Sequence, residues 1–532
     1  MADLIHEFIT QSAQVTPDSP ALLFKDQTYS YAQLSESVQQ AANGFLAQGL
    51  QAGERVAVYL PKQPETVYTL FGAAAAGCCF VPVNPILKPK QLAHILPDCQ
   101  VRVLVTSAAR LEGLRSVLDE CPDLQAVVIV DEKLPDTSDS FPIPVIAYAQ
   151  FLDTSATVSP HRRIDTDMTA ILYTSGSTGN PKGVVLSHRN MVAGANSVAS
   201  YLQNTGNDKI LAVLPLSFDA GLSQLTTGFS VGASVVIMDY LLPRDVIRAV
   251  AKYSITGLGA VPPLWNQLKD LEWPDEAVQT MRYITNTGGA MPVPTTKVLQ
   301  AALPETDIYL MYGLTEAFRS TYLPPDQVNV RPESMGKAIP NADVRVINDD
   351  GIECGPNEPG ELVHRGALVS LGYWNDRKKT DERFKPSPLR PNEIPNQELA
   401  VWSGDQVVKD DEGYLYFISR KDEMIKTSGY RVSPTEVEEA VYTSGLVASA
   451  AAMGAPHAAI GQAIVLVISA ADTDQDPAEL IAALTAHCRK ELPNFMVPAK
   501  IVVVDALPQN QNGKIDRKTL AELHKDSFAE DS

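Results

Sequence analysis

The sequence has little of what builds disulfide frameworks and metal centres. Its six cysteines are scattered, with one adjacent pair and no CxxC spacing, which argues against both a disulfide framework and a zinc site. The eight histidines include no pair at the spacing that places two metal ligands on one face of a helix. We therefore expect reduced thiols, as in cytoplasmic proteins, and no histidine-based metal site.

Positive charge is also scarce. Lys and Arg total 43 against 63 Asp and Glu, and a net charge of -20 argues against a general nucleic-acid binder, which needs a basic face. The best membrane candidate, residues 70–83, falls short of the roughly 20 residues that span a bilayer. Asp3 and Glu7 stand where a signal peptide carries Lys or Arg. These features predict a cytoplasmic protein without membrane insertion, whose N-terminal segment forms a packing helix.

Apolar residues, in contrast, are plentiful enough for a large folded core. Hydrophobic residues make up 45% of the 532 positions and charged residues 20%. A chain of this length is expected to form more than one domain. Between residues 50 and 260, short β-rich runs alternate with helical stretches such as residues 108–118. This alternation predicts parallel strands joined by crossover helices.

The pattern changes toward the C-terminus. Short strands and turns between about 340 and 419 predict a small β-rich subdomain that completes an N-terminal core of residues 1–419. A small α+β domain is expected over residues 423–532, after a junction at residues 420–422. The predicted fold class is therefore α/β, with layered α/β subdomains and a β-rich subdomain in the large N-terminal domain, followed by the small α+β domain.

Residues 173–184, YTSGSTGNPKGV, have the composition of an anion-binding loop. Hydroxyl side chains alternate with glycines, so that backbone N–H groups can approach a phosphate closely, and Lys182 adds a positive charge. The segment is not a P-loop, because Pro181 replaces the second glycine and Gly183 replaces the metal-binding hydroxyl. A flexible Gly/Ser linker is the alternative, but apolar runs that resemble strands flank the segment on both sides.

This loop and four later motifs resemble the signatures of the adenylate-forming superfamily, which includes acyl-CoA synthetases, luciferases and the adenylation domains of peptide synthetases. In order, the later motifs are MYGLTEA (311–317), WSGDQV (402–407), SRKDEMIKTSGYRV (419–432) and NQNGKIDR (510–517). The resemblance covers residues 20–520. It implies an AMP-forming acid–thiol ligase that uses ATP and Mg²⁺ to make an acyl- or aminoacyl-adenylate, releases pyrophosphate, and transfers the acyl group to a thiol with release of AMP.

The resemblance also implies a role for each motif residue. Lys514, Glu316 and Thr174 are the expected catalytic residues, with Glu316 as the magnesium ligand. The expected ATP- and AMP-binding residues are Thr174, Ser175, Gly176, Ser177, Thr178, Gly179, Lys182, Tyr312, Gly313, Thr315, Asp405 and Arg420. Asp422 corresponds to a hinge about which the small, mobile domain rotates between adenylation and thioester formation.

The residue types suit acid activation in their own right. Attack of a carboxylate on the α-phosphate of ATP brings two anions together, so the site needs a cation where charge accumulates, and Lys514 can supply it. Glu316 offers a hard oxygen ligand of the kind that Mg²⁺ prefers. Taken singly, Asp405 or Lys514 would more often be a turn residue or a solvated charge. The interpretation therefore depends on the ordered set of motifs.

Residues 214–224, LPLSFDAGLSQ, concern the acid substrate. Phe218–Asp219 resembles amino-acid-activating domains, where the Asp pairs with the substrate ammonium, more than it resembles acyl-CoA synthetases. Arg319 suggests a second carboxylate in the substrate, although an internal salt bridge between Asp219 and Arg319 is the alternative. The predicted substrate pocket comprises Phe218, Asp219, Thr287, Gly288, Gly289, Met311, Arg319 and Ser320.

The sequence does not identify the thiol that accepts the acyl group. The chain ends soon after the lysine motif without a carrier domain, so we expect CoA or a stand-alone acyl carrier protein, through its phosphopantetheine, to act in trans. Segments such as TNTGGAMP (285–292) most closely resemble acyl-CoA ligases associated with exosortase systems. The alternatives are a fatty or aryl acyl-CoA synthetase, a non-catalytic nucleotide-binding relative and a luciferase-like oxygenase.

Overall fold

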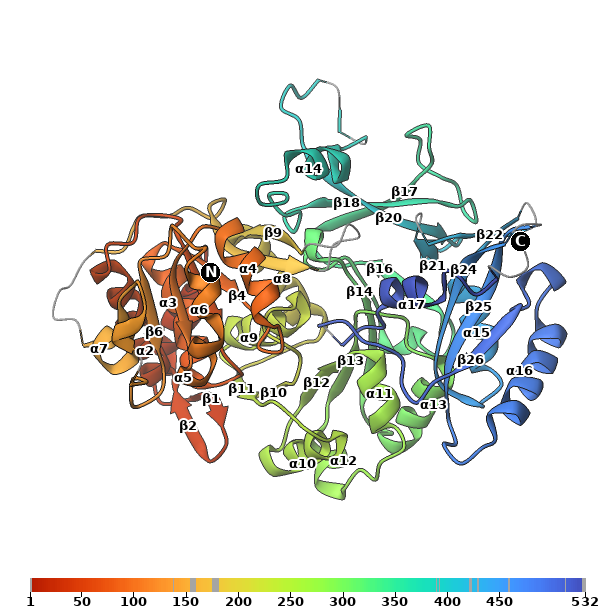
Figure 1. Ribbon diagram of the computed structural model, residues 1–532, viewed down its shortest axis with the longest axis horizontal. Helices are drawn as coiled ribbons and strands as arrows, with labels where there is room; N and C mark the ends of the chain where they lie inside the picture. The colour runs from red at the N-terminus through yellow and green to blue at the C-terminus, as the bar shows by residue number, and fades with distance from the viewer. Residues whose placement is uncertain are drawn as a thin grey trace.

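In the computed structural model, the chain forms three β-sheets flanked by helices (Figure 1). Two sheets build a large N-terminal α/β domain and the third lies in a small C-terminal domain, which confirms the predicted fold class. The structure describes residues 2–136, 138–153, 159–174, 181–388, 390–391, 393–420, 423–427, 430–457, 460–511 and 513–528.

The first sheet belongs to the N-terminal part of the chain. Its strands are β3 (Arg55–Tyr59), β4 (Cys79–Pro82), β5 (Val101–Thr106), β6 (Ala126–Ile129), β7 (Val145–Ala147), β8 (Met168–Thr174) and β9 (Lys182–Ser187). They lie in the order β7-β6-β5-β3-β4-β8-β9. All neighbours run parallel except β8 and β9, which pair antiparallel. The antiparallel β8–β9 pair interrupts the predicted parallel alternation, which resumes in the second sheet over residues 209–260.

The second sheet spans the middle of the molecule. Its strands are β1 (Pro20–Phe24), β2 (Gln27–Ser30), β10 (Lys209–Ala212), β11 (Ser234–Ile237), β12 (Gly257–Ala260), β13 (Tyr283–Asn286), β14 (Asp307–Tyr312), β15 (Thr321–Leu323), β16 (Ser334–Ala338), β17 (Ala342–Ile347), β18 (Gly360–Gly366), β19 (Phe384–Pro386), β20 (Leu399–Lys409) and β21 (Leu415–Arg420). Their order is β17-β18-β20-β21-β16-β15-β14-β13-β12-β10-β11-β1-β2, with β19 paired to β20. The strands from β11 to β14 run parallel, whereas the end formed by β15 to β21 is antiparallel.

The third sheet belongs to the C-terminal domain. Its strands are β22 (Ile425–Thr427), β23 (Tyr430–Val432), β24 (Val447–His457), β25 (Gly461–Ala470) and β26 (Lys500–Val503). The order is β23-β22-β25-β24, and β26 runs parallel to β25. Apolar side chains on one face of this sheet, among them Ile464, Leu466 and Ile468, form a separate core with two helices of the same domain.

Helices cover the sheets and connect their strands (Figure 1). The described α-helices are α1 (Glu7–Val15), α2 (Tyr31–Ala47), α3 (Pro64–Ala76), α4 (Pro89–Asp98), α5 (Ala108–Leu111), α6 (Arg115–Leu118), α7 (Tyr148–Leu152), α8 (His188–Tyr201), α9 (Asp219–Ser230), α10 (Pro243–Tyr253), α11 (Pro262–Leu268), α12 (Asp275–Thr280), α13 (Val293–Ala302), α14 (Arg377–Arg383), α15 (Pro434–Tyr442), α16 (Pro477–Glu491) and α17 (Arg517–His524). Short 3-10 turns are η1 (Glu112–Leu114), η2 (Ser138–Ser140), η3 (Thr315–Ala317), η4 (Pro325–Gln327) and η5 (Asn494–Met496).

The expected helix over residues 108–118 is broken in the structure. The segment forms α5, η1 and α6 in succession. Gly113 lies in the middle, and a glycine in a helix interior costs about 1 kcal/mol relative to alanine. Leu111, Leu114 and Leu118 are nevertheless buried against the first sheet. Packing of these leucines therefore fixes the segment without a continuous helix.

The N-terminal segment packs as expected, although α1 begins only at Glu7. Ile5 is buried before the helix, and Phe8 and Ile9 are buried within it. The backbone N–H of Ile5 donates a hydrogen bond of 3.2 Å to Nδ1 of His188. Burial, with a smaller effect of the neighbouring His6, lowers the pKa of His188 to about 3. The neutral imidazole thus serves as a buried acceptor that ties the N-terminus to α8.

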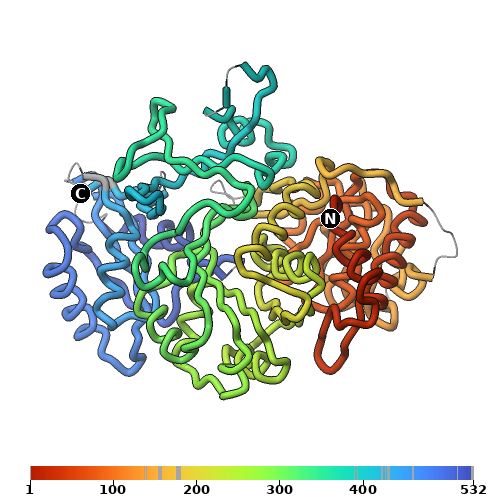
Figure 2. The backbone as a smooth tube through the Cα atoms, turned by 180° about the vertical axis from the view of Figure 1, so that it is seen from behind, coloured from red at the N-terminus to blue at the C-terminus, as the bar shows by residue number. Residues whose placement is uncertain are grey.

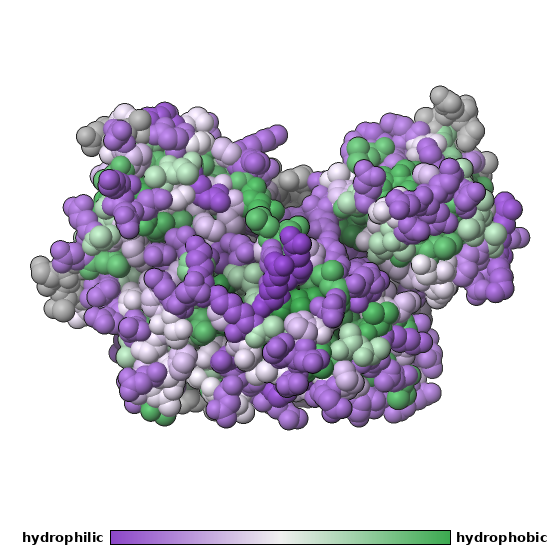
Figure 3. All heavy atoms as spheres, turned by 90° about the horizontal axis from the view of Figure 1, so that it is seen from below, coloured by the Kyte–Doolittle hydropathy of each residue, from purple (hydrophilic) through white to green (hydrophobic). Residues whose placement is uncertain are grey.

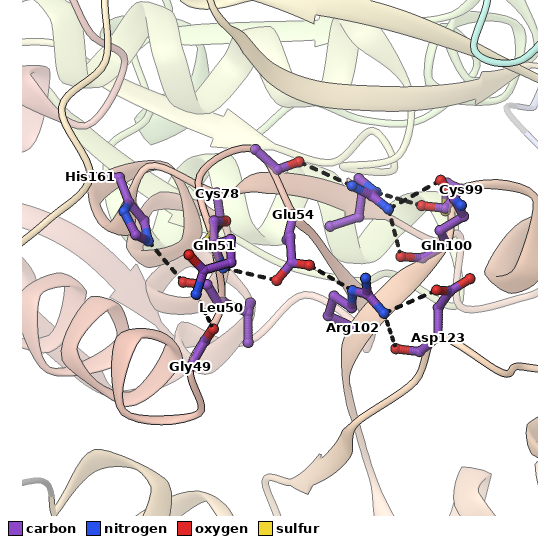
Figure 4. Close-up of polar contacts among 12 residues, drawn as sticks. Gly49, Leu50, Gln51, Glu54, Cys78, Cys99, Gln100, Arg102, Asp123 and His161 are labelled. Atoms are coloured by element: carbon purple, nitrogen blue, oxygen red, sulfur yellow. Dashed lines mark hydrogen bonds and ion pairs between the residues drawn. The ribbon is translucent and has the colours of Figure 1, made fainter.

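Polar contacts hold the amino ends of the strands in the first sheet. Arg102 donates to Glu54 at 2.7 Å and to Asp123 at 3.0 Å, and His161 contacts the carbonyl oxygen of Leu50 at 2.8 Å (Figure 4). All of these residues belong to segments that precede or begin strands. These contacts therefore stabilise the end of the sheet that is formed by the amino ends of its strands. This end lies opposite the carboxyl ends of the same strands.

Most of the surface is hydrophilic. On the face in Figure 3, hydrophobic side chains occur in small groups among hydrophilic ones. In the part of the chain that the structure describes, no helix has both the length and the apolar character to cross a membrane. The six cysteines are buried and free.

Among the described residues, contacts between the C-terminal and N-terminal domains include a hydrogen bond from the hydroxyl of Ser433 to the carbonyl oxygen of Ile418 and the two contacts that follow. The amide of Asn266, on α11, donates a hydrogen bond of 3.0 Å to the carbonyl oxygen of Ala448 on β24. The second contact is made by the segment after β26, residues 510–516, which we call the lysine loop. Figures 1 and 2 show this blue segment reaching away from its own sheet toward the centre of the molecule.

Candidate active site

Residues that follow the carboxyl ends of parallel strands in both N-terminal sheets surround the lysine loop. The loop approaches Tyr173 at the end of β8, Val261 just after β12 and Gly288 just after β13. The crevice outside the carboxyl ends of the strands is where open α/β sheets bind their ligands. The docked loop therefore places one edge of the C-terminal domain at the expected ligand site.

Lys514 is the innermost side chain of this loop. Its Nζ lies 4.9 Å from the centre of the Phe218 ring. A Cβ placed on Gly288 would lie only 2.8 Å from Cε of Lys514, and Gly288 has a φ of +81°. Burial lowers the pKa of Lys514, with the charge of Asp219 acting in the opposite direction. A glycine at position 288 is thus needed both for its backbone conformation and for the room that it leaves to Lys514.

Asp219 and Arg319 face each other at the predicted substrate pocket. Nη1 of Arg319 lies 3.9 Å from Oδ2 of Asp219, a distance too long for a hydrogen bond, and the residues are 5% and 3% exposed. Asp219 accepts a hydrogen bond of 2.7 Å from the N–H of Ala220, and Arg319 donates one of 3.2 Å to the carbonyl oxygen of Phe318. Nε of Arg319 is buried and finds no hydrogen-bond partner among the described residues. The side chains of Asp219 and Arg319 can therefore still form hydrogen bonds to a ligand.

A small cavity of about 40 Å³ lies beside this pair. Arg319, Met311 and Thr287, three of the residues expected in the substrate pocket, contribute to its lining. The lining also contains polar side chains (Ser223, Gln224, Thr227, Tyr283 and Thr285) and apolar ones (Val198, Leu202, Ile210, Leu214 and Ala220). A water molecule takes up about 30 Å³ in the liquid, so the space has room for a small group and not for a long apolar chain.

The other predicted pocket residues lie next to the cavity. Ser320 is fully buried, and its hydroxyl lies 2.8 Å from Nδ1 of His364, so it is turned away from the cavity lining. The carbonyl oxygen of Gly289 accepts a hydrogen bond of 2.9 Å from Asn286. The sequence could place these residues near the pocket but could not show which way each one faces.

The phosphate-binding candidates lie at the β8–β9 hairpin. Thr174 ends β8, and Lys182 is its register partner at the start of β9. The intervening candidates Ser175, Gly176, Ser177, Thr178 and Gly179 lie outside the described residues. Nζ of Lys182 lies 5.3 Å from the centre of the Tyr373 ring, and partial burial together with the nearby Lys379 lowers the pKa of Lys182.

Glu316 lies in η3, within the same cluster. The hydroxyl of Tyr373 donates a hydrogen bond of 2.5 Å to Oε1 of Glu316. Burial and the charge of Glu316 raise the pKa of Tyr373, so the phenol stays protonated as the donor. This leaves the other carboxylate oxygen of Glu316 for a ligand. A single carboxylate that shares Mg²⁺ with phosphate oxygens is a common magnesium site, so this arrangement fits the metal.

Sequence reasoning missed Tyr373 and Arg383. Nη1 of Arg383 donates a hydrogen bond of 3.1 Å to the carbonyl oxygen of Trp402, and a Cβ on Gly404 would lie 2.4 Å from the same nitrogen. Among the described residues, Arg383 has no carboxylate within ion-pair distance. The segments LGYWND and RKKTDER carry these two residues but do not reveal their closeness to Glu316, which is far away in the sequence.

The nucleoside candidates Asp405, Arg420 and Tyr312 form one cluster. Asp405 on β20 and Arg420 on β21 are register partners, with Oδ1 of Asp405 3.4 Å from Nε of Arg420. The hydroxyl of Tyr312 donates a hydrogen bond of 2.5 Å to Oδ2 of Asp405. Burial raises the pKa of Asp405, while Arg420 opposes the shift. Oδ1 of Asp405 accepts no hydrogen bond from the residues described, so a ribose hydroxyl fits here as a donor.

The two remaining nucleotide-site candidates adjoin this cluster. Thr315 is buried at the start of η3, next to Glu316. A Cβ on Gly313 would lie 3.2 Å from the Cα of Arg319. A glycine at position 313 therefore allows the backbone of Arg319 to approach closely. Asp422, the predicted hinge, lies outside the described residues.

Comparison with family models identifies both domains. Residues 9–374 match the model described as AMP-binding enzyme. Residues 436–514 match the model described as AMP-binding enzyme C-terminal domain.

Relatives with two kinds of acceptor are similar to this chain. The long-chain-fatty-acid–CoA ligase of Escherichia coli O157:H7 is 29% identical over 97% of this chain and 93% of the relative. The L-proline–[L-prolyl-carrier protein] ligase of Streptomyces coelicolor is 31% identical over 94% of this chain and 93% of the relative. A linear gramicidin synthase from Brevibacillus parabrevis is 28% identical over 97% of this chain, but the chain spans only 10% of that protein's length.

Solved structures share the fold. The anthranilate CoA ligase in complex with anthranoyl-AMP superposes with a TM-score of 0.87 at 24% identity, covering 98% of both chains. The o-succinylbenzoate CoA synthetase of Bacillus subtilis in complex with its acyl-adenylate gives 0.80 at 25% identity, covering 96% of this chain and 97% of the other. The same synthetase has also been solved with ATP and a magnesium ion.

Proposed function

The chain belongs to the AMP-binding enzyme family, a family of AMP-forming acid–thiol ligases, and we propose that it activates a small polar acid, favoured to be an amino acid. One observation carries the proposal. Lys514, from the C-terminal domain, lies beside Phe218 at the acid pocket and within electrostatic range of Asp405 on the nucleotide side. A cation in this position serves a reaction in which a carboxylate meets a phosphate.

The first half-reaction follows from this placement. A carboxylate oxygen of the acid attacks the α-phosphate of ATP, the bond between the α- and β-phosphates breaks, and pyrophosphate leaves. Lys514 binds both anions as they approach, while Asp405 and Tyr312 orient the nucleoside. Lys182 and Arg383 face the pyrophosphate side. When bound through Glu316, Mg²⁺ neutralises charge on the phosphates.

The second half-reaction transfers the acyl group to a thiol. The sulfur attacks the carbonyl carbon of the adenylate, the bond from that carbon to the phosphate oxygen breaks, and AMP leaves. We propose CoA or the phosphopantetheine of a stand-alone carrier protein as the acceptor. Rotation of the C-terminal domain about Asp422 would withdraw Lys514 and admit the thiol. We also propose that residues 1–419 form the N-terminal core and that residues 423–532 form the C-terminal domain that rotates.

The acid is proposed to carry an ammonium group and a second carboxylate. Asp219 would pair with the ammonium and Arg319 with the carboxylate, through charge-assisted hydrogen bonds worth about 1.5–3 kcal/mol each. Two observations support this assignment. Nε of Arg319 has no partner among the described residues, and the adjoining cavity of about 40 Å³ has polar side chains such as Ser223 and Gln224 in its partly apolar lining. Such a cavity does not favour a long fatty acid.

The test is a panel of acids scored by ATP–pyrophosphate exchange, with thioester formation measured in parallel for CoA and for an acyl carrier protein. The panel contains acidic amino acids, neutral amino acids, dicarboxylic acids, aryl acids and fatty acids. We expect amino acids, acidic ones above all, to give the fastest exchange. Preference for fatty or aryl acids would refute the substrate assignment, and exchange at background for all acids would favour a non-catalytic role.

Association of the protein with an exosortase system and its cytoplasmic location remain predictions.

A further inference from the structure

Asn84 connects the N-terminal domain to the lysine loop. It follows β4 in the segment VPVNP and is 2% exposed. Its Oδ1 accepts a hydrogen bond of 3.1 Å from the N–H of Ile86, which orients the side chain. Its Nδ2 donates a hydrogen bond of 2.5 Å to the carbonyl oxygen of Gln511. One short amide side chain therefore joins two segments that lie far apart in the sequence.

Gln511 makes a second contact with the same domain. Its side-chain amide approaches the carbonyl oxygen of Tyr173 at 3.4 Å, directly before Thr174. Tyr173 is itself held, because its hydroxyl donates a hydrogen bond to Asp98. The lysine loop is thus attached to the ends of β4 and β8, two neighbouring parallel strands.

Hydrogen bonds among described residues of the lysine loop connect Asn510, the neighbour of Gln511, to Lys514. The N–H of Lys514 donates a hydrogen bond of 3.1 Å to Oδ1 of Asn510, and the N–H of Asn510 donates one of 2.7 Å to the carbonyl oxygen of Lys514. The N–H of Gly513 donates to the carbonyl oxygen of Asn510 at 2.9 Å. These bonds couple the position of Lys514 to that of Asn510, so we expect a shift of the adjacent Gln511 carbonyl to displace Lys514.

We propose that Asn84 is a positioning residue for the adenylation half-reaction, which holds Lys514 at the acid pocket and releases it before thioester formation. The inference rests on the proposed function. The role needs an amide, since one end of the side chain must accept from Ile86 while the other donates to Gln511. A carboxylate would keep the first bond, but it would lose the second and place a negative charge against the Gln511 carbonyl.

The test compares Asn84→Asp with the wild type in the two half-reactions. We expect Asn84→Asp to slow ATP–pyrophosphate exchange by about ten- to hundred-fold, as expected for loss of a buried hydrogen bond plus repulsion. Thioester formation from adenylate that is already bound should be unchanged or faster. Asn207→Asp, the same change at an exposed position before β10, is the matched control and should leave both rates unchanged. Equal slowing of both half-reactions by Asn84→Asp, or no slowing, would overturn the proposal.

Two further measurements keep the test independent of folding and of the acid. Gln511→Ala removes the contact to Tyr173 from a partly exposed loop, and it should slow exchange selectively, by about two- to five-fold. Hydrogen–deuterium exchange of the lysine loop in the presence of MgATP alone should be faster in Asn84→Asp than in the wild type. This readout needs no acid substrate, so an enzyme that activates none of the acids in the panel would refute the proposed function but not the contact. Unchanged deuterium exchange would refute the contact itself.

Discussion

The ammonium group of Lys514 lies over the ring of Phe218, 4.9 Å from its centre, although the two residues belong to different domains. Phe218 directly precedes Asp219 at the start of α9 and so lies next to a residue of the proposed acid pocket. The ring face attracts the ammonium group and helps to position it, while N–H groups that point away from the ring can bind anions. The predictions below follow from this arrangement.

Replacement of Lys514 by alanine should nearly abolish adenylation. Loss of one preorganised donor to a developing charge costs about 3–4 kcal/mol, so kcat/KM for pyrophosphate exchange should fall by about 100- to 1,000-fold. Lys514→Arg should not restore the rate, because Gly288 leaves little room around Cε. Thioester formation from bound adenylate serves as the control and should persist. Near-normal exchange in Lys514→Ala would contradict the assigned role.

Gly288→Ala tests whether the space next to Gly288 is needed to place the side chain of Lys514. The new Cβ would lie 2.8 Å from Cε of Lys514, and a displacement of a catalytic group by about 1 Å can cost 100-fold in rate. Gly413→Ala is the matched control, since φ is +83° there and no atom lies within 4 Å. Both changes carry a left-handed backbone cost of about 1–2 kcal/mol. Only Gly288→Ala should slow exchange, and equal slowing in both would show that backbone strain is the cause.

Tyr373→Phe should weaken the use of magnesium. The variant removes the hydroxyl that donates to Glu316, and a hydrogen bond to a charged group is worth about 1.5 kcal/mol or more. The Mg²⁺ concentration for half-maximal exchange should rise by about tenfold. Tyr253→Phe, which removes a hydrogen bond of 2.6 Å to the carbonyl oxygen of Lys25 on the surface, is the control. An unchanged magnesium requirement would mean that Tyr373 does not orient a metal ligand.

Arg319→Ala should change which acid is preferred. We expect preference for a second carboxylate to fall by about 10- to 150-fold, which corresponds to about 1.5–3 kcal/mol. The acid panel, repeated with this variant, measures the change. Unfolding temperature must be followed as well, because removal of one partner from a buried ion pair destabilises the fold. Unchanged acid preference with a lower unfolding temperature would mean that Asp219 and Arg319 serve only as an internal pair.

His364 should make stability depend on pH. Burial lowers its pKa to about 4, whereas in the unfolded chain it titrates near the ordinary value of about 6.5. Between these values the unfolded state binds the extra proton, so the free energy of unfolding should fall as pH drops from 6.5 toward 4. The loss is at most about 1.4 kcal/mol per pH unit for this group.

Thermal unfolding at pH 7 and pH 5 tests this dependence. The wild type should lose more in unfolding temperature than His364→Gln over the same interval, because the glutamine does not titrate. His188 remains in both proteins and contributes equally. An identical loss in the two proteins would show that His364 is not the titrating group.

The sequence motifs predicted most of the candidate site. Their resemblance to the family's motifs named Lys514, Glu316 and Asp405, and the position of Arg319 shortly after Glu316 suggested that it lies in the acid pocket. Local patterns also predicted the alternation of strands and helices between residues 50 and 260, since short apolar runs between turns are typical of buried strands. The helix expected over residues 108–118 was wrong, because burial of leucines on the sheet does not require a continuous helix.

Sequence alone determined which residue types are available for the proposed chemistry: glycines and hydroxyls for an anion-binding loop, a carboxylate suited to a metal, and a lysine near the C-terminus. Only the tertiary structure decided the neighbours of these groups. Tyr373 meets Glu316, and Asn84 meets Gln511, through contacts across 57 and 427 residues of chain. Local pattern cannot encode such pairs, because they depend on how strand ends from separate sheets and domains come together.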